Sequence, residues 1–204
     1  MDYYPLFLDL RARPVLVIGG GYIALEKVRN LLKAGAQITL IAPQILPSLR
    51  RFNRRVTLIE RAFAFSDLEE RFLLVFCATE DTTLNAQIST QCREKRLLCN
   101  TVDDPQWCHF IVPSMLRRGA LTVAISTAGV SPTLAKQLKQ ELLATLDVTY
   151  TRLTRWLKGY RTRLKSRIPT LEGRKVFWTQ FYAQNPLKIL REKGEKGLED
   201  LVNG

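Results

Sequence analysis

The chain has 204 residues, of which 46% are hydrophobic and 25% charged, a composition typical of one or two globular domains with a buried core. No apolar run approaches the roughly 18 residues that cross a bilayer, and the N-terminal MDYYPLFLDL lacks the basic start of a secretory signal, so we expect a cytoplasmic protein with no membrane partner. The net charge of +12 predicts an anionic partner, and the 4 cysteines, which lack CxxC spacing, are expected to be reduced thiols.

The first predicted unit is a strand at 14–18, a glycine turn, a helix at 22–33 and a second strand at 37–42. Within it, Gly19, Gly21 and Ala24 follow the spacing G-x-G-x-x-G/A. The first glycine permits a tight turn, the second permits close approach of a pyrophosphate, and the small Ala24 permits close helix packing. This order predicts a bound dinucleotide with its phosphates at the helix N-terminus. The alternative is a glycine turn that only packs tightly.

The residues that follow the second strand do not distinguish NAD from NADP. An acidic residue for the ribose is expected there, but the sequence has Ala42, Pro43 and Gln44. No arginine follows the strand directly, although Arg50 and Arg51 lie near enough in the sequence to contact a 2′-phosphate.

Further strands are predicted at 56–60, 72–78 and 96–102, with a helix capped by Asp81 or Thr82. Alternating strands and helices predict a Rossmann-like doubly wound parallel sheet, which binds ligands beyond the carboxyl ends of its strands. The turns that should meet at this edge are 19–21, 43–44, 79–81 and 100–104.

The pattern changes from residue 110. Two strands are expected at 110–113 and 121–126, joined by a basic turn at 117–119. Ser131 and Pro132 then have the residue types of a helix N-cap and a first helical position.

Two more helices are expected, at 150–168 and around 176–182, and the tail from 193 is expected to fray. The first carries basic residues and no acid from Arg152 to Arg167. This face is either solvated, a surface for carboxylates, or a phosphate-binding surface for nucleic acid. We expect no nucleic-acid partner, because no nucleic-acid-binding fold is recognisable.

Several ordered blocks along nearly the whole chain resemble the precorrin-2 dehydrogenase family, the N-terminal module of siroheme synthases. The blocks are PLFLDL (5–10), VLVIGGGYIALEKV (15–28), LLKAGAQITLIAP (31–43), FCATED (76–81), CNTVDDP (99–105), FIVPS (110–114) and AISTAGVSPTLAKQL (124–138).

The resemblance implies NAD⁺-dependent oxidation of precorrin-2, an anionic tetrapyrrole, to sirohydrochlorin on the route to sirohaem and, in some organisms, cobalamin. Some members of the family also insert Fe²⁺ into the product. The resemblance further implies a homodimer with an NAD-binding domain at 1–113, a dimerisation segment at 114–147 and a helical domain at 148–204.

The family's functional residues map onto specific positions of this chain. The resemblance implies dinucleotide contacts at Gly21, Tyr22, Ile23, Pro43, Gln44 and Thr79. It also assigns the reactive carboxylate to Asp103 and not to Asp104. This carboxylate could act as general base during aromatisation, orient pyrrole N–H groups or receive Fe²⁺, and it is the one candidate for a metal contact. The alternative is a simple turn before Pro105.

Substrate contacts are expected from Ser126 and Thr127 after the last strand, and from Arg152 and Arg155 on the basic helix. Thr127 occupies the position where some family members have a phosphorylatable serine. His109 is the single histidine of the chain, and its role is either structural or functional. Competing interpretations are a bifunctional dehydrogenase and chelatase, a catalytically inactive dinucleotide-sensing scaffold, and a basic nucleic-acid binder.

Overall fold

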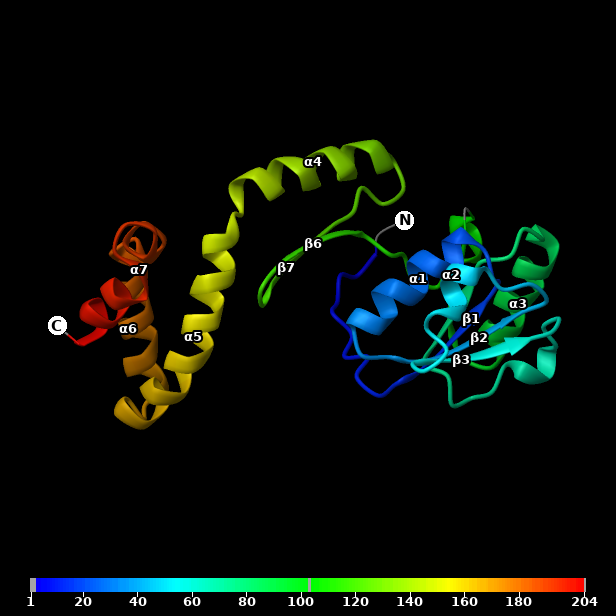
Figure 1. Cartoon of the computed structure of the whole chain (residues 1–204), viewed down its shortest axis with the longest axis horizontal. Coiled ribbons are helices and arrows are strands. Elements are labelled where there is room, and N and C mark those ends of the chain that lie inside the picture. The colour runs from blue at the N-terminus through cyan, green and yellow to red at the C-terminus, as the bar shows by residue number, and fades with distance from the viewer. Residues whose placement is uncertain (1–2, 103, 204) are drawn as a thin grey trace. The chain divides into compact units, whose positions relative to one another are not determined.

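The computed structural model describes residues 3–102 and 104–203 and divides into two compact units, Met1–Val112 and Pro113–Gly204 (Figure 1). Each unit has a hydrophobic core of its own. In the described part of the chain, no helix is both long enough and apolar enough to span a bilayer.

The first unit alternates strands with helices, as the sequence predicts. Its elements are β1 (Pro14–Ile18), α1 (Tyr22–Lys33), β2 (Gln37–Ala42), α2 (Pro47–Arg50), β3 (Val56–Glu60), η1 (Phe65–Asp67), β4 (Leu74–Cys77), α3 (Thr82–Glu94), β5 (Leu98–Thr101) and η2 (Pro105–Trp107). The strands form a parallel sheet in the order β3-β2-β1-β4-β5. The predicted doubly wound fold is therefore confirmed.

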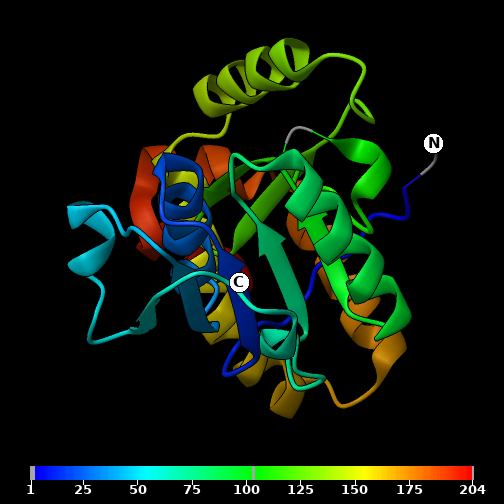
Figure 2. The same ribbon diagram turned by 90° about the vertical axis from the view of Figure 1, so that its right-hand side faces the viewer.

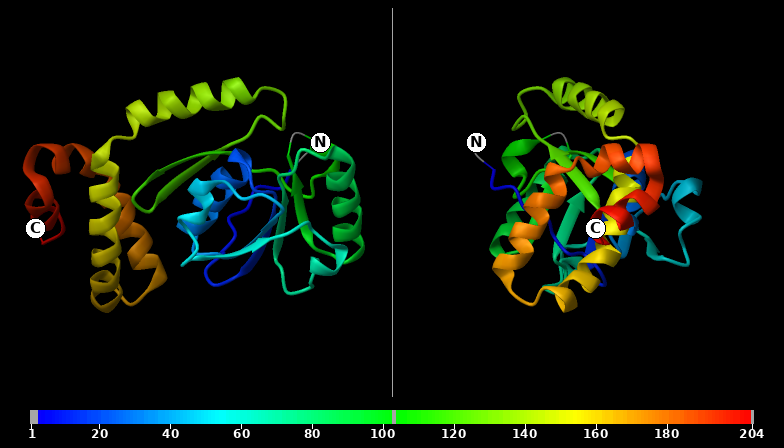
Figure 3. Two further views of the ribbon diagram at one scale, coloured as in Figure 1. Left: turned by 45° about the vertical axis from the view of Figure 1, so that its right-hand side comes forward. Right: turned by 90° about the vertical axis from the view of Figure 1, so that its left-hand side faces the viewer.

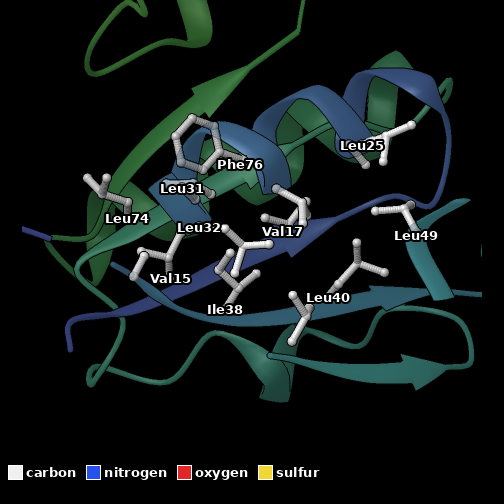
Figure 4. Packing of buried hydrophobic residues seen from close by; sticks show 14 of the residues in the cluster. Val15, Val17, Leu25, Leu31, Leu32, Ile38, Leu40, Leu49, Leu74 and Phe76 are labelled. Atoms are coloured by element: carbon white, nitrogen blue, oxygen red, sulfur yellow. The ribbon is translucent and has the colours of Figure 1, made fainter. Parts of the chain in front are cut away.

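The two faces of this sheet are covered by different helices, because successive side chains of a strand point to opposite faces. Val15 and Val17 of β1 pack in one cluster with the apolar stripe of α1, as Figure 4 shows. Leu16 and Ile18 pack in a second cluster with Ile88 of α3. The helices α1 and α3 accordingly lie on opposite sides of the sheet (Figure 2).

The sheet order places a topological switch between β1 and β4. The chain runs outward from β1 to β3 and then returns to pair β4 with the other edge of β1. Ligands of open parallel sheets bind in the crevice that such a reversal leaves beyond the strands' carboxyl ends. The turns after β1 and β4 are therefore the part of this unit that is placed to bind a ligand.

The cysteine thiols lie mainly in the core beneath this sheet. All 4 are free; Cys77, Cys92 and Cys99 are buried and Cys108 is half-buried. Hydrogen bonding to Cys99 and burial both raise the pKa of the Cys92 thiol. A raised pKa keeps a thiol protonated and unreactive, which agrees with the expected reduced state. No cluster of His, Cys, Asp or Glu that could hold a metal occurs among residues 3–102 and 104–203.

The second unit begins with a hairpin and continues with helices. Its elements are β6 (Ser114–Arg118), β7 (Leu121–Ile125), α4 (Pro132–Thr145), α5 (Val148–Arg167), α6 (Leu171–Ala183) and α7 (Pro186–Asn203). Ser131 caps α4 as predicted, accepting a hydrogen bond from the Leu134 N–H. The helices α5 and α6 run side by side (Figure 3) and share a core that includes Trp156 and Phe181.

The prediction of a strand at 110–113 is wrong. The first hairpin strand is Ser114–Arg118, and it pairs antiparallel with β7 around a two-residue turn at Gly119 and Ala120. Pro113 has no N–H to donate to a ladder. The ring of Phe110 packs instead edge-on against Phe76 in the core of the first unit, with ring centroids 5.5 Å apart.

The expectation of a frayed tail is also wrong. Residues Pro186–Asn203 form α7, with a non-helical break at Gly194. Leu198 is fully buried and Val202 is 7% exposed, both in the core shared with α5. This burial, which the polar composition of the tail conceals, holds the segment in place.

Glu199 of α7 links that helix to α5 and makes the stability of the second unit sensitive to acid. Its carboxylate accepts hydrogen bonds from Arg163 Nη2 at 2.6 Å and Trp156 Nε1 at 2.9 Å. The Arg163 guanidinium, with help from the indole N–H, holds the pKa of Glu199 below its usual 4.5. The stabilisation is therefore complete above pH 4.5 and is lost as the pH falls below it.

We expect Glu199→Gln to lower the free energy of unfolding at pH 7 by about 0.5–1 kcal/mol, because the pair is partly exposed. The variant should also lose less stability than the parent below pH 4.5. Urea titrations at several pH values measure both effects. Glu172→Gln, which removes a more exposed pair with Lys175, is the control and should change little. Equal losses in the two variants would contradict this role of Glu199.

Candidate dinucleotide-binding site

The turns after β1, β2 and β4 are joined by backbone hydrogen bonds at the carboxyl edge of the sheet. The Gly19 N–H donates to Ile41 O at 2.9 Å, and the Ala78 N–H donates to Ile18 O at 2.7 Å. The Leu46 N–H donates to Gly20 O at 3.1 Å. Three of the expected turns thus meet at one edge, around the switch between β1 and β4.

The three glycines of the turn have different reasons to be glycine. Gly19 has φ +122°, and a Cβ there would lie 2.2 Å from Ala78 O. A Cβ on Gly20 would lie 1.9 Å from Gln44 O, so Gly20 is required by the protein's own packing. Apart from its neighbours in the chain, Gly21 has no atom of the described residues within 4 Å of its Cβ position. The space in front of Gly21 is therefore open to a ligand, whereas Gly19 and Gly20 allow the turns to approach each other.

The N-terminus of α1 faces that open space with free donors. Gly21 is its N-cap and has no side chain, and no acidic residue occupies the first turn of the helix. Tyr22 and Ile23 are exposed at 79% and 43%, whereas Ala24 is fully buried against the sheet. Unpaired N–H groups and the positive end of the helix dipole favour an anion such as a pyrophosphate. A dinucleotide therefore fits the residues present.

The turn after β2 carries the next predicted contacts. Pro43 and Gln44 are exposed directly beyond the buried Ala42. Arg50, one of the two arginines considered for a 2′-phosphate, forms an ion pair with Glu60 at the end of β3. Its charge is thus already compensated within the protein. Arg51 is exposed at the end of α2.

Thr79, the predicted contact after β4, is held by a residue that sequence reasoning missed. Asn85 of α3 is 5% exposed, and its side chain hydrogen-bonds twice to Thr79. The signal was present in the sequence, because Asn85 lies beside Leu84 and three residues before Ile88, on the face expected to be buried. A buried amide must have hydrogen-bond partners, and here Thr79 supplies them.

Asp103 lies outside the described residues, and the segment around it is held by hydrogen bonds of Thr101, Asp104 and Cys108. The Thr101 hydroxyl donates to Asp104 O at 2.9 Å, and Cys108 Sγ lies 3.4 Å from the same oxygen. The Asp104 carboxylate accepts a hydrogen bond from Gln106 Nε2 at 3.1 Å. The backbone of Asp104 thus helps to hold the turn, while its side chain makes only a local contact.

His109 has a structural environment in this segment. Its backbone N–H donates to Cys99 O at 2.8 Å, and its Nδ1 lies 3.0 Å from Leu97 O and 3.2 Å from Cys99 N. His109 thereby pairs with the outer edge of β5. Nearby, Asn100 Nδ2 donates to Phe110 O at 3.0 Å and braces the same connection.

The four residues expected to contact substrate all lie in the second unit. Ser126 Oγ accepts from the Ala128 N–H at 3.0 Å, and Thr127 Oγ1 accepts from the Ser131 N–H at 3.0 Å. Both hydroxyls therefore take part in the turn before α4. Arg152 and Arg155 lie on α5, half-buried and exposed respectively.

The parallel sheet with its switch point and open glycine turn defines a dinucleotide-binding protein. A family model described as putative NAD(P)-binding matches residues 6–114, more than half of the chain, and a model described as sirohaem biosynthesis protein central matches residues 118–145. The chain therefore belongs to the putative NAD(P)-binding family, and the match of residues 118–145 to a sirohaem biosynthesis protein agrees with the predicted resemblance.

Curated relatives and a solved structure agree with this membership. The chain is 38% identical over 209 residues to a siroheme synthase of Thioalkalivibrio sulfidiphilus, covering 98% of this chain and 42% of that protein. It is 39% identical over 184 residues to a siroheme synthase of Zymomonas mobilis, covering 89% and 39%. The chain thus spans about two fifths of the length of these curated relatives. A structure of SirC, a precorrin-2 dehydrogenase, matches 99% of this chain and 100% of its own with a TM-score of 0.72 and 25% identity.

Proposed function

We propose that this chain oxidises precorrin-2 to sirohydrochlorin with NAD⁺. The observation that carries the proposal is the open space at Gly21, in front of the uncapped N-terminus of α1 and at the switch point of a parallel sheet. The match to a precorrin-2 dehydrogenase over the full length of both chains supports the choice of substrate.

The oxidation removes a hydride and a proton from the tetrapyrrole, and the nicotinamide supplies the hydride acceptor. The chain's own residues bind the dinucleotide and orient it and the substrate. The N–H groups at Tyr22 and Ile23 hold the pyrophosphate, and Thr79 shapes the crevice beside it. Asp103 takes the proton as general base.

We propose NAD⁺ as the cofactor in preference to NADP⁺. The ion pair between Arg50 and Glu60 supports this choice, because it compensates one of the two guanidinium groups that could attract a 2′-phosphate. The exposed Gln44 supplies a neutral amide to the ribose hydroxyls.

The substrate carries several carboxylates, which require cations. We propose that Arg152 and Arg155 of α5 contact them, because guanidinium groups bind carboxylates with matching geometry. Ser126 and Thr127 add hydroxyl contacts. We also propose a homodimer whose dimerisation segment is 114–147. The exposure of Leu134 at 45% and of Leu138 at 37% on α4 supports this, because a partner chain could bury the apolar surface that these leucines leave exposed.

An anaerobic assay with precorrin-2 tests the proposal, after light scattering has established the oligomeric state of the purified protein. With NAD⁺, absorbance at 340 nm should rise in proportion to sirohydrochlorin formed, and NADP⁺ should support a slower reaction. Absence of a reduced cofactor with either dinucleotide would contradict the dehydrogenase function and favour a sensing or scaffold role.

The same assay continues with Fe²⁺ to test metal insertion, with iron as a second substrate. Conversion of sirohydrochlorin to sirohaem faster than in a protein-free control would establish a bifunctional enzyme, and loss of this conversion in Asp103→Asn would assign Asp103 to both reactions. An unchanged sirohydrochlorin spectrum would restrict the activity to dehydrogenation.

A further inference from the structure

The amide of Asn85 is the buried polar group most closely tied to the predicted cofactor crevice. Asn85 Nδ2 donates to Thr79 O at 3.0 Å, and the Thr79 hydroxyl donates to Asn85 Oδ1 at 2.7 Å. Donor and acceptor of one amide are therefore both used by one residue. The Thr79 hydroxyl also lies 3.2 Å from Asp81 O, at the cap of α3.

This pairing determines the shape of the turn at the switch point. The turn after β4 approaches the glycine turn so closely that a Cβ on Gly19 would lie 2.6 Å from Ala78 C and 3.3 Å from Thr79 N. A small displacement would therefore bring Thr79 into contact with the glycine turn or take it away from that turn. Asn85, anchored in α3, opposes both displacements.

Because Asn85 is buried, its hydrogen bonds to Thr79 favour a single conformation of the turn after β4. Asn85 is 5% exposed, so its amide has little access to water if Thr79 moves away. An unpaired amide in a buried site is strongly disfavoured, and the turn is thereby held in one conformation. Leucine or alanine at this position would fill the helix face without restricting the turn.

We propose that Asn85 is a positioning residue for the dinucleotide, acting through Thr79 to hold the β4 turn in the shape that admits the cofactor beside the glycine turn. The inference rests on the proposed function, because it takes Thr79 as part of the cofactor crevice. Asn85 itself is not expected to contact the cofactor.

The test is the dissociation constant for NAD⁺, measured by calorimetry on the full chain. Asn85→Ala should raise it about tenfold, because the turn is no longer restricted to one conformation. Asn85→Asp keeps the acceptor for the Thr79 hydroxyl but loses the donor to Thr79 O. It should therefore also raise the dissociation constant for NAD⁺. If the alanine variant does not fold, the aspartate variant carries the test. KM for NAD⁺ should rise with no change in KM for the tetrapyrrole.

Ser89→Ala is the matched control. Ser89 lies one helical turn further along α3, is fully buried, and donates a hydrogen bond to Trp107 O at 2.6 Å. Its removal should lower Tm comparably to Asn85→Ala while leaving the NAD⁺ dissociation constant within about twofold. Cofactor binding is compared, and not turnover, because Trp107 follows the segment that contains Asp103.

Two results overturn the inference. One is an NAD⁺ affinity unchanged in both Asn85 variants, and the other is an equal loss in Ser89→Ala. Failure of the proposed function is distinguishable, since the unaltered chain would then either bind neither dinucleotide or bind one without reducing it in the precorrin-2 assay.

Discussion

Replacement of Gly21 with aspartate is expected to weaken NAD⁺ binding at least 100-fold while leaving the fold intact. Apart from the adjacent residues of the chain, no described atom lies within 4 Å of a Cβ at this position, so the protein itself accommodates the side chain. The aspartate would instead occupy the space proposed for the pyrophosphate and repel its charge. Calorimetry measures the loss of binding, and thermal unfolding should show a Tm within about 3 °C of the parent.

Gly20→Val supplies the contrast to that experiment. A Cβ at Gly20 would lie 1.9 Å from Gln44 O, which is backbone and cannot move aside without shifting the turn after β2. We expect this variant to lose the cooperative unfolding transition or to unfold far below the parent. Unchanged NAD⁺ affinity in Gly21→Asp would show that the dinucleotide does not approach the glycine turn. A stable Gly20→Val protein would show that the turns are not packed as described.

Asp103→Asn is expected to lower turnover of precorrin-2 by about 10²–10⁴, the usual contribution of a general base. Asparagine has nearly the same size as aspartate but cannot accept a proton at neutral pH. The NAD⁺ dissociation constant should stay within about twofold, because the proposed pyrophosphate contacts are the N–H groups at Tyr22 and Ile23 and not a carboxylate. Single-turnover kinetics under anaerobic conditions separate the chemical step from binding and release.

Asp104→Asn is the matched control for Asp103→Asn. The structure uses the backbone oxygen of Asp104, which accepts from Thr101, while its carboxylate contacts Gln106. Asparagine retains the backbone contact and can replace the side-chain contact, so turnover should change less than threefold. Equal losses in the two variants would assign the effect to the turn. Full activity in Asp103→Asn would remove this residue from the mechanism.

The elements of the first unit were predictable because their signals are local. The strand at 14–18, the helix at 22–33 and the strands at 37–42 and 56–60 have the predicted bounds. Each apolar run is bounded by glycine, proline or a charged residue, and its period distinguishes strand from helix. Asp81 accepts a hydrogen bond from the Leu84 N–H, as expected of a helix cap.

The elements that sequence reasoning missed depend on long-range contacts. Phe110 is apolar and was assigned to a strand, yet its position is decided by Phe76, far away in the sequence. The polar composition of the tail conceals Leu198 and Val202, which are buried against α5. Local composition gives no information on either contact, because each depends on which surface the folded chain presents.

The sequence by itself determined the class of fold and the place of the candidate site. Strand order in the chain, the glycine spacing and the polar turns sufficed, because parallel strands bring their carboxyl ends to one edge. Only the tertiary structure decided which glycine is open to a ligand, that Gly20 is required by Gln44, and that Asn85 holds Thr79. These assignments depend on the distances between atoms of different turns and helices in the folded chain, and no sequence period records such distances.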